Sequence, residues 1–540
     1  MDNSLDAPSK ANIELAEHLP SLEFSSAYPH AVDAVHWRET HISWVILTGR
    51  YAYKIKKPVD FGFLNFSTLS LRKRFCEQEV RLNQRTAPDW YLGVEPLWEY
   101  DGKLNFLGQG NIVDYAVKMV QFDPDALLSN VLADQTKVNA VGSVFFQRLG
   151  YDLAQFHLSA EPATADSEFG RLESIEYAAM QNFEQILPRI QAQEGNDGDI
   201  ESVSRLASWT QQQLKTLTPY FKERKKAGKV LECHGDLHLG NIAVLNDKAV
   251  AFDCIEFNDG FRWIDSASDL AFLIMDMEFN GYGGWANQVL NSYLEYSFDY
   301  DLLRVLTFYK VYRAMVRAKV SLLRLDSIEP GGDCQNALAQ FKGYIEYGLT
   351  LLNRMPPFML MTSGVSGSGK STFARSFCAN EQAIHLRSDV VRKQVAGLKP
   401  LDTSNSDINT GIYTAQHSDK TFCRLQQITQ KTVEAGYSVV VDATFLTQKD
   451  RRPFMELAIN LNVPFVIGFL HVPTEELVRR IERRNAEAND SSEATVEVME
   501  KQQAVQERFS EQELPHCVIA YDDKGEVNRK AIQAVIAQQR

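Results

Sequence analysis

An apolar run followed by a glycine-rich stretch constrains this chain more than any other feature. Residues 358–363, FMLMTS, lead directly into GVSGSGKST at residues 364–372. The second stretch fits the pattern Gly-x-x-x-x-Gly-Lys-Ser/Thr, whose backbone N–H groups surround phosphate when a buried strand precedes it and a helix follows. Further apolar runs at 435–445 and 463–472 alternate with helical segments, which is typical of a doubly wound parallel sheet.

We therefore expect the glycine-rich stretch to bind ATP. Its glycines let backbone N–H groups turn toward phosphate, Lys370 can reach the β- and γ-oxygens, and the Ser371 hydroxyl can ligate Mg2+. The residues expected at the nucleotide are Gly364, Ser366, Gly367, Ser368, Gly369, Lys370, Ser371 and Thr372.

Acidic and basic residues after this stretch favour a kinase over a motor-type ATPase. Asp389 and Arg392 lie three residues apart, so one helix face can present both, and Asp442 ends an apolar run as a magnesium-binding carboxylate would. The arrangement resembles the polynucleotide kinase, gluconate kinase and zeta-toxin group of P-loop kinases. That resemblance implies that Asp389 accepts a proton from a substrate hydroxyl and that Arg392 holds substrate or phosphate, although Asp389 as a helix cap stays open.

Arg480 and Arg484 lie one helical turn apart before a polar stretch. This pattern predicts a lid over about residues 479–497 that brings arginines to the transferring phosphate. The alternative is a solvated helix surface on which the arginines pair with Glu475, Glu476 and Glu482.

A second polar cluster lies in VLECHGDLHLGNIAVL, residues 230–245, between two short apolar stretches. Asp236 falls on the expected turn, where its carboxylate can accept the proton of an attacking hydroxyl. Asn241 follows five residues later and Asp253 ends AVAFD, so both offer hard oxygen ligands for Mg2+. A base and two metal ligands thus fall within 18 residues.

HGDLHLGNI followed by AFDCIEF resembles the aminoglycoside phosphotransferase and choline kinase branch of the protein-kinase-like superfamily. The resemblance implies Asp236 as catalytic base and Asn241 and Asp253 as magnesium ligands. His234 and Asp269 would brace the loop. His238 can contact substrate or make a structural hydrogen bond.

The same resemblance implies a phosphate-binding lysine on a strand and a glutamate partner on a helix. Lys54 and Glu79 stand at those positions. Lys56 lies on the same face of the alternating strand, and Glu77 is an equal candidate to Glu79, so both choices stay open.

The chain as a whole resembles a bacterial group in which an aminoglycoside phosphotransferase-like region is fused to a P-loop ATP-binding region. The expected fold class is α/β and α+β multidomain, a bilobal protein-kinase-like fold followed by a doubly wound P-loop domain. The predicted boundaries are a first domain at 1–350 (N-lobe about 30–125, C-lobe about 126–350), a linker at 351–357 and a second domain at 358–540.

Local patterns within the first region predict individual elements. Alternating apolar and polar residues at 41–57 predict a β-hairpin, and helical spacing at 69–87 predicts a helix that buries Leu71, Phe75, Val80 and Leu82. The polar stretch 191–201 predicts a loop, and two or three helices are expected up to about 354, with a turn at Gly331 and Gly332.

Composition narrows the class of protein and its partners. The net charge is −14, and residues 1–356 carry 34 Lys and Arg against 47 Asp and Glu, which disfavours a nucleic-acid groove there. Seven scattered cysteines predict reduced thiols, and the absence of a signal-like start or a long apolar run predicts a cytoplasmic protein without a membrane partner.

These patterns together predict a bifunctional ATP- and Mg2+-dependent phosphotransferase in which each region phosphorylates a hydroxyl of a small molecule. One alternative is that one region binds nucleotide only to gate the other. Another is that the P-loop region is a nucleic-acid 5′-end kinase, which its near-neutral charge makes the weaker choice. The acceptor of each region, the preference for ATP over GTP and the oligomeric state stay open.

Overall fold

The computed structural model describes residues 11–191, 197–325, 334–400, 402, 411–487, 495–521 and 525–540. The chain divides into two compact units, Met1–Phe145 with Ser159–Arg171 and Arg224–Leu273, and Phe146–Leu158 with Leu172–Glu223 and Ile274–Arg540. The predicted linker at 351–357 does not separate these units, because the helices before it group with the parallel sheet after it. The domain boundaries inferred from the sequence stay a prediction.

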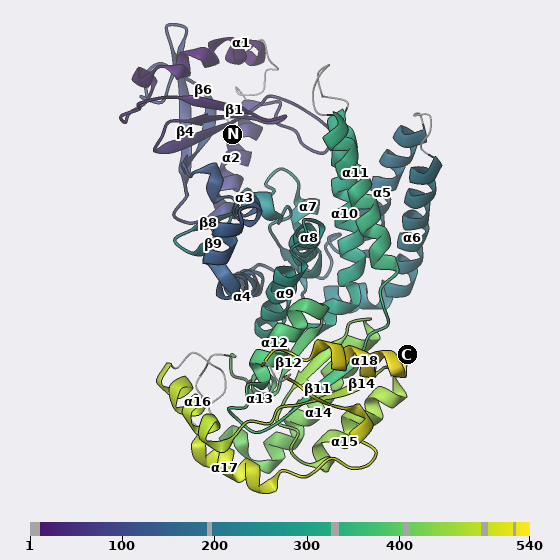
Figure 1. Ribbon diagram of the computed structural model, residues 1–540. Helices are drawn as coiled ribbons and strands as arrows, with labels where there is room; N and C mark the ends of the chain where they lie inside the picture. The colour runs from purple at the N-terminus through teal and green to yellow at the C-terminus, as the bar shows by residue number, and fades with distance from the viewer. Residues whose placement is uncertain are drawn as a thin grey trace. The chain divides into compact units, whose positions relative to one another are not determined.

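The first unit is built on a six-stranded antiparallel sheet in the order β1-β2-β3-β6-β4-β5 (Figure 1). Helix α2 (Leu69–Asn83) packs against β4 and β6. The other face is covered by an apolar cluster to which α1 (Ala11–His18) and η2 (Leu19–Glu23) contribute. The strands are β1 His36–Glu39, β2 Ser43–Leu47, β3 Tyr51–Lys56, β4 Tyr91–Tyr100, β5 Lys103–Asn105 and β6 Asn111–Val120.

The predicted hairpin at 41–57 is confirmed as the antiparallel pair β2 and β3. Period-two alternation turns Tyr53 and Ile55 into the apolar cluster and leaves Lys54 and Lys56 on the opposite face. The predicted helix at 69–87 is confirmed over Leu69–Asn83, but the predicted buried face is wrong. Of the expected residues only Leu82 is buried, whereas Leu71, Phe75 and Val80 are half-buried. The buried positions are Arg72, Cys76, Glu79, Leu82 and Asn83. A polar face is buried here because it meets charged groups from other segments.

Short elements complete the first unit around the polar cluster. Strand β7 (Val230–Glu232) pairs with β10 (Trp263–Asp265), and β8 (Ile242–Leu245) pairs with β9 (Lys248–Ala251). The cluster therefore lies between two two-stranded ribbons. The helical segments nearby are η4 Pro124–Ala126, α3 Leu128–Ala133, η5 Leu239–Asn241, α7 Asp259–Arg262 and the start of α8 Ser266–Phe279.

Long helices form one part of the second unit. Helix α10 (Leu303–Leu325) packs against α5 (Leu172–Gln191) and α11 (Cys334–Leu352). Helix α9 Gly283–Ser297 also belongs to this unit, as do the larger parts of α4 Gln135–Ser159 and α6 Asp197–Lys226, and η6 Tyr300–Leu302 precedes α10. The predicted turn at 331–332 lies outside the described residues. No helix of the described residues is both long and apolar enough to cross a membrane.

The other part of the second unit is a five-stranded parallel sheet in the order β12-β13-β11-β14-β15 (Figure 1). This confirms the predicted doubly wound sheet and, with the antiparallel sheet of the first unit, the predicted fold class. The strands are β11 Met359–Ser363, β12 Ile384–Arg387, β13 Val439–Asp442, β14 Phe465–Phe469 and β15 Cys517–Ile519. The helices are α12 Lys370–Glu381, α13 Ser388–Val395, α14 Ala415–Glu434, α15 Gln448–Asn460, α16 Thr474–Glu487, α17 Val496–Val505 and α18 Arg529–Gln539, with η7 Gly411–Tyr413 and η8 Leu514–His516.

Side chains of helix α9 provide hydrogen-bond partners for backbone groups at β12, the edge strand of this parallel sheet. Asn287 and Asn291 both donate side-chain hydrogen bonds to the Ala383 carbonyl, at 3.0 and 3.1 Å, and Asn291 Oδ1 accepts the His385 N–H at 2.7 Å. Backbone groups of an edge strand need such partners when they are buried. The two asparagines thus join α9 to β12.

We predict that Asn291→Ala lowers the free energy of unfolding by about 1–3 kcal/mol, because the His385 N–H is left buried without its acceptor. Denaturant unfolding of the full chain measures this. Asn380→Ala, which removes an exposed asparagine of α12, is the matched control and should be close to neutral. Equal stability of the two variants would contradict the edge contact.

Candidate active sites

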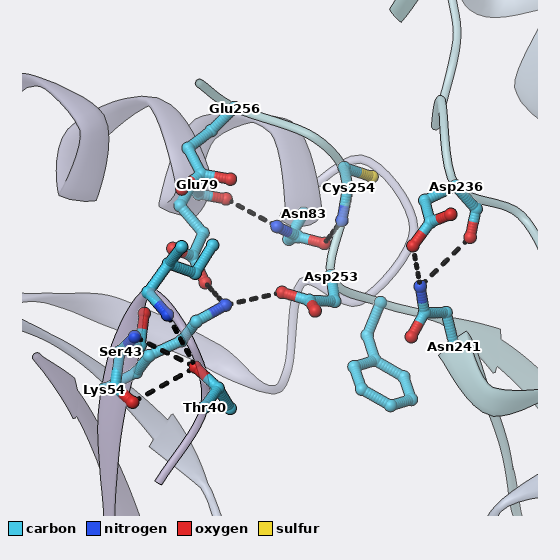
Figure 2. A network of polar contacts seen from close by, with 12 residues as sticks. Thr40, Ser43, Lys54, Glu79, Asn83, Asp236, Asn241, Asp253, Cys254 and Glu256 are labelled. Carbon is cyan, nitrogen blue, oxygen red and sulfur yellow. Dashed lines mark hydrogen bonds and ion pairs between the residues drawn. The ribbon is translucent and has the colours of Figure 1, made fainter. Parts of the chain in front are cut away.

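Two features of the loop between β7 and β8 fix the position of Asp236. They are the backbone conformation at Gly235 and the side-chain amide of Asn241. Gly235 has φ +89°, and a Cβ there would lie 2.8 Å from the Phe261 carbonyl oxygen, so only glycine fits. Asn241 Nδ2 donates to both the backbone oxygen and Oδ2 of Asp236, each at 3.0 Å (Figure 2). The amide therefore orients the carboxylate that the sequence assigns as base.

Asp269 of α8 fixes the start of this loop. Its two carboxylate oxygens accept the backbone N–H groups of His234, at 3.1 Å, and Gly235, at 2.8 Å. His234 Nε2 lies 2.8 Å from the Phe252 carbonyl oxygen, which joins the loop to the end of β9. The geometry gives His234 and Asp269 the bracing positions expected from the sequence.

Asp253 follows β9 in a strained backbone conformation. Its φ is +63°, in the left-handed region that non-glycine residues rarely occupy. The Asp253 N–H donates to the Tyr91 hydroxyl at 3.2 Å, and the next N–H, of Cys254, donates to Asn83 Oδ1 at 2.9 Å. These two bonds to β4 and α2 hold the turn that presents the Asp253 carboxylate.

Lys54 connects three segments of the first unit. Its ammonium lies 2.9 Å from Glu79 Oε1 and 2.6 Å from Asp253 Oδ1 (Figure 2). Burial alone would raise the pKa of Glu79, but the ammonium groups of Lys54 and Lys56 lower it to about 2. Glu77 is exposed and lies 3.9 Å from Lys73, so the geometry favours Glu79 as the partner.

A hub of arginines around Glu232, which the sequence did not reveal, ties α2 to the loop. Arg81 of α2 makes a two-pronged contact with the Glu232 carboxylate, at 2.7 and 2.9 Å. Arg262 Nε lies 3.2 Å from the same carboxylate, and Arg85 donates to the carbonyl oxygens of Glu232, at 2.6 Å, and Cys233, at 3.1 Å. Paired guanidinium groups make a buried carboxylate tolerable and fix the helix that carries Glu79.

The donor set of the first site fits a hard divalent cation. Asn241 uses its amide nitrogen on Asp236, which leaves its Oδ1 as the atom that can face a cation, and Asp253 contributes a half-exposed carboxylate. Amide and carboxylate oxygens are the ligands that Mg2+ takes in such sites.

The glycine-rich stretch of the second unit turns between β11 and α12. Gly367 and Gly369 have φ +84° and +90°, and a Cβ on Gly367 would lie 2.9 Å from Ile481 of α16. The Ser368 hydroxyl is buried and has no hydrogen-bond partner among the described residues, which fits a phosphate oxygen. Lys370 begins α12 and donates to the Val365 carbonyl at 2.8 Å.

Helices beyond β14 approach the same turn. Leu477 and Ile481 of α16 and Met499 of α17 form an apolar cluster with Val365. Gln502 Oε1 of α17 accepts the Ser366 N–H at 2.7 Å, a contact that the sequence did not indicate. The segment proposed as a lid therefore packs on the glycine-rich turn, although residues 488–494 of it lie outside the described residues.

Asp442 ends β13, as predicted, and lies 3.1 Å from His385 Nε2. Burial would raise the pKa of Asp442, but the hydrogen bond and charge of His385 hold it well below its usual range. Asp389 lies in the first turn of α13. The N-cap of this helix is Arg387, so Asp389 does not occupy the cap position considered as an alternative. Arg392 donates to the Ile412 carbonyl and to Ser418, both at 3.0 Å.

The two predicted lid arginines, Arg480 and Arg484, both belong to α16 (Thr474–Glu487). Arg480 Nε donates to Glu476 Oε1 at 2.7 Å, which matches the surface-pair alternative, yet a Cβ on Gly369 would lie 3.5 Å from Nη1 of Arg480. The Arg480 side chain therefore reaches the glycine-rich turn as well. Arg484 belongs to α16, and its side chain lies outside the described residues.

The family model described as AAA domain matches residues 359–509. This match covers the strand, the glycine-rich turn and the helices that approach it. Together with the parallel sheet, it supports the sequence-based interpretation of the second region as a P-loop nucleotide-using region of a kinase.

Relatives over most of the chain come from mycobacteria. Uncharacterised proteins of Mycobacterium tuberculosis and Mycobacterium bovis are 27% identical over 461 residues, which is 85% of this chain and 88% of each relative.

Solved structures of kinases are weakly similar to parts of this chain. A choline/ethanolamine kinase family protein from Mesorhizobium loti covers 63% of this chain and 95% of its own, with 13% identity and a TM-score of 0.37. A gluconokinase from Sinorhizobium meliloti covers 34% and 93%, with 17% identity and a TM-score of 0.24. Likenesses this weak carry no argument about activity.

The structure pairs Asp236 with Asn241 and groups Lys54 with Glu79 and Asp253. Around the glycine-rich turn it gathers Lys370, Ser366, Ser368 and Arg480, while the roles of all these residues stay predictions. The partners Glu256, Glu232, Gln502 and His385 were missed by sequence reasoning. Of these, Glu256 and Glu232 had a local signal, because they lie within the quoted stretches AFDCIEF and VLECHGDLHLGNIAVL.

We predict that Gly235→Ala is more destabilising than Gly102→Ala by about 1–3 kcal/mol. Both glycines have positive φ, but a Cβ at Gly102 meets nothing within 4 Å, whereas one at Gly235 meets backbone. Thermal unfolding of the two variants isolates the close approach from the backbone strain. Equal shifts in Tm would show that the loop can move away.

Proposed function

We propose that this chain is a bifunctional ATP-dependent phosphotransferase, in which each region transfers the γ-phosphate of ATP to a hydroxyl of a small molecule. The observation that carries the proposal for the first region is the placement of Lys54 between Glu79 and Asp253. A lysine held by a helix carboxylate, next to a metal-binding carboxylate, is the arrangement that kinases use to position phosphates.

In the first region, Asp236 would take the hydroxyl proton as the acceptor oxygen forms its bond to phosphorus and the bond to the ADP oxygen breaks. Asn241 keeps the Asp236 carboxylate oriented for that proton. Lys54 would hold the phosphates of ATP. Asn241 and Asp253 would hold Mg2+, which would supply positive charge that stabilises the phosphates during transfer.

In the second region, the backbone N–H groups of the glycine-rich turn and Lys370 would bind the phosphates at the start of α12. Ser371 and Asp442 would hold Mg2+, and Asp389 would accept the proton from the acceptor. Arg392, Arg480 and Arg484 would contact transferring phosphate. This requires Arg392 to leave its contacts with Ile412 and Ser418, and Arg480 to leave Glu476.

Small acceptors are favoured over nucleic acid for both regions. The first region is acidic, and residues 357–540 carry 22 Lys and Arg against 23 Asp and Glu, so neither has the positive charge that nucleic-acid backbones require.

We predict that Asp236→Ala and Lys370→Ala each abolish a different part of ATP turnover. A screen of a metabolite library for γ-phosphate transfer by the wild type and both variants measures this. Loss of the general base in Asp236→Ala should lower transfer by the first region about 10²–10⁴-fold. Lys370→Ala removes a phosphate ligand of the second region, so each variant should fail on its own set of acceptors. Equal loss of all activity in either variant would contradict independent regions and favour gating of one by the other.

We predict that Glu79→Gln weakens phosphoryl transfer by the first region, whereas Glu77→Gln leaves it unchanged. Glu79 contacts Lys54, whereas Glu77 lies on the exposed side of α2 near Lys73. Steady-state kinetics with an acceptor found in the screen compare the two. A larger effect of Glu77→Gln would reverse the assignment of the lysine's partner.

A further inference from the structure

A second lysine of β3 lies in the same network as Lys54 but deeper. Lys56 is 1% exposed, and its ammonium lies 2.6 Å from Glu79 Oε2, in contact with Glu256 and 4.9 Å from the centre of the Phe66 ring. Lys54 is 14% exposed. The two lysines alternate with Ile55 on the strand, so they extend from the same face toward α2.

Glu79 divides its carboxylate between the two lysines. Oε1 faces Lys54 and Oε2 faces Lys56, so both oxygens are fixed and the carboxylate cannot rotate without breaking an ion pair. Glu79 is itself fully buried. A buried carboxylate with one departing partner loses much of its stabilisation, whereas one with a second permanent partner does not.

Glu256 joins this pair to the segment that carries Asp253. It lies three residues after Asp253, is 5% exposed and contacts Lys56, while its backbone oxygen accepts a hydrogen bond from Arg262 at 3.2 Å. Lys56 is therefore bound to α2 through Glu79 and to the Asp253 segment through Glu256. Lys54 makes the same two connections through Glu79 and Asp253.

The two connections differ in what nucleotide binding would do to them. If the first region binds MgATP as proposed above, Lys54 must turn to phosphate and Asp253 to the metal, so their 2.6 Å contact is exchanged for new partners. The contacts of Lys56 involve neither phosphate nor metal. They can persist through the exchange.

We propose that Lys56 and Glu256 are positioning residues of the phosphate clamp, which hold Glu79 and the Asp253 segment in place while Lys54 exchanges Asp253 for the phosphates of ATP. This inference rests on the proposed function of the first region. It differs from the alternative that Lys56 itself binds phosphate, because Lys56 is engaged by two buried carboxylates.

The test uses the full chain carrying Lys370→Ala, so that the second nucleotide site does not report. Equilibrium binding of MgATP, measured by titration calorimetry, and the Tm are compared for Lys56→Met, Glu256→Gln and the double variant. Lys57→Met is the matched control, because Lys57 is the next lysine in the chain and pairs with the exposed Glu39. Lys54→Met gives the reference for loss of the clamp itself.

We expect Lys56→Met to weaken MgATP binding about 10-fold, less than Lys54→Met, and to lower the Tm because Glu256 is left buried without its cation. The double variant removes that lone charge, so its Tm should recover while its affinity stays low. Lys57→Met should bind as its parent does.

Three outcomes would overturn the inference. Recovery of affinity together with Tm in the double variant would show that the pair serves stability alone. Loss in Lys56→Met as complete as in Lys54→Met would make Lys56 the phosphate ligand. Unchanged affinity in Lys56→Met would remove the pair from the clamp, whereas a parent that binds no MgATP would overturn the proposed function first.

Discussion

The buried carboxylate of Glu79, shared between two lysines, is the interaction on which the first unit depends. A charge without water must be fully paired, and each of its partners must then be paired in turn. This requirement brings together β3, α2 and the segment that follows β9, because Lys54 and Lys56 also need Asp253 and Glu256. Asn83 and Arg81 add hydrogen bonds from the same helix. The site is thus positioned by charge pairing as much as by apolar packing.

The phosphate site proposed for the second unit depends on a different physical arrangement. There the glycine-rich turn offers backbone N–H groups at a helix start, and close approach of Ile481 and of the Leu470 carbonyl oxygen excludes side chains at Gly367 and Gly364. The charged groups near this turn are Lys370, at the start of α12, and Asp442, which ends β13 and pairs with His385. A backbone cradle needs few long-range ion pairs, which is why a short local pattern identified it in the sequence.

The sequence supplied the local parts of both sites and could not supply their remote partners. The β2–β3 hairpin, α2, the Asp236–Asn241 loop and the parallel sheet follow from alternation, helical spacing and glycine placement over a few residues. Lys56 and Glu256 are 200 residues apart, and Arg81 and Glu232 are 151 apart. No periodicity encodes such pairs. The apolar pattern did not predict the buried polar face of α2 for the same reason, because the burial of that face depends on charged residues elsewhere in the chain.

The division of the chain into units has a consequence for how the P-loop region is held. The segments before the predicted linker contact the P-loop region in two ways. Asn287 and Asn291 make hydrogen bonds beside β12. Ion pairs join Arg304 to Glu434, at 2.9 Å, and Asp301 to Lys431, at 2.8 Å. Exposed ion pairs contribute little, but the β12 edge has buried groups that need those asparagines. His385, whose N–H is one of them, also holds Asp442. The residues that precede the linker therefore help to set the carboxylate at the end of β13, and a cut at the linker would remove part of its support.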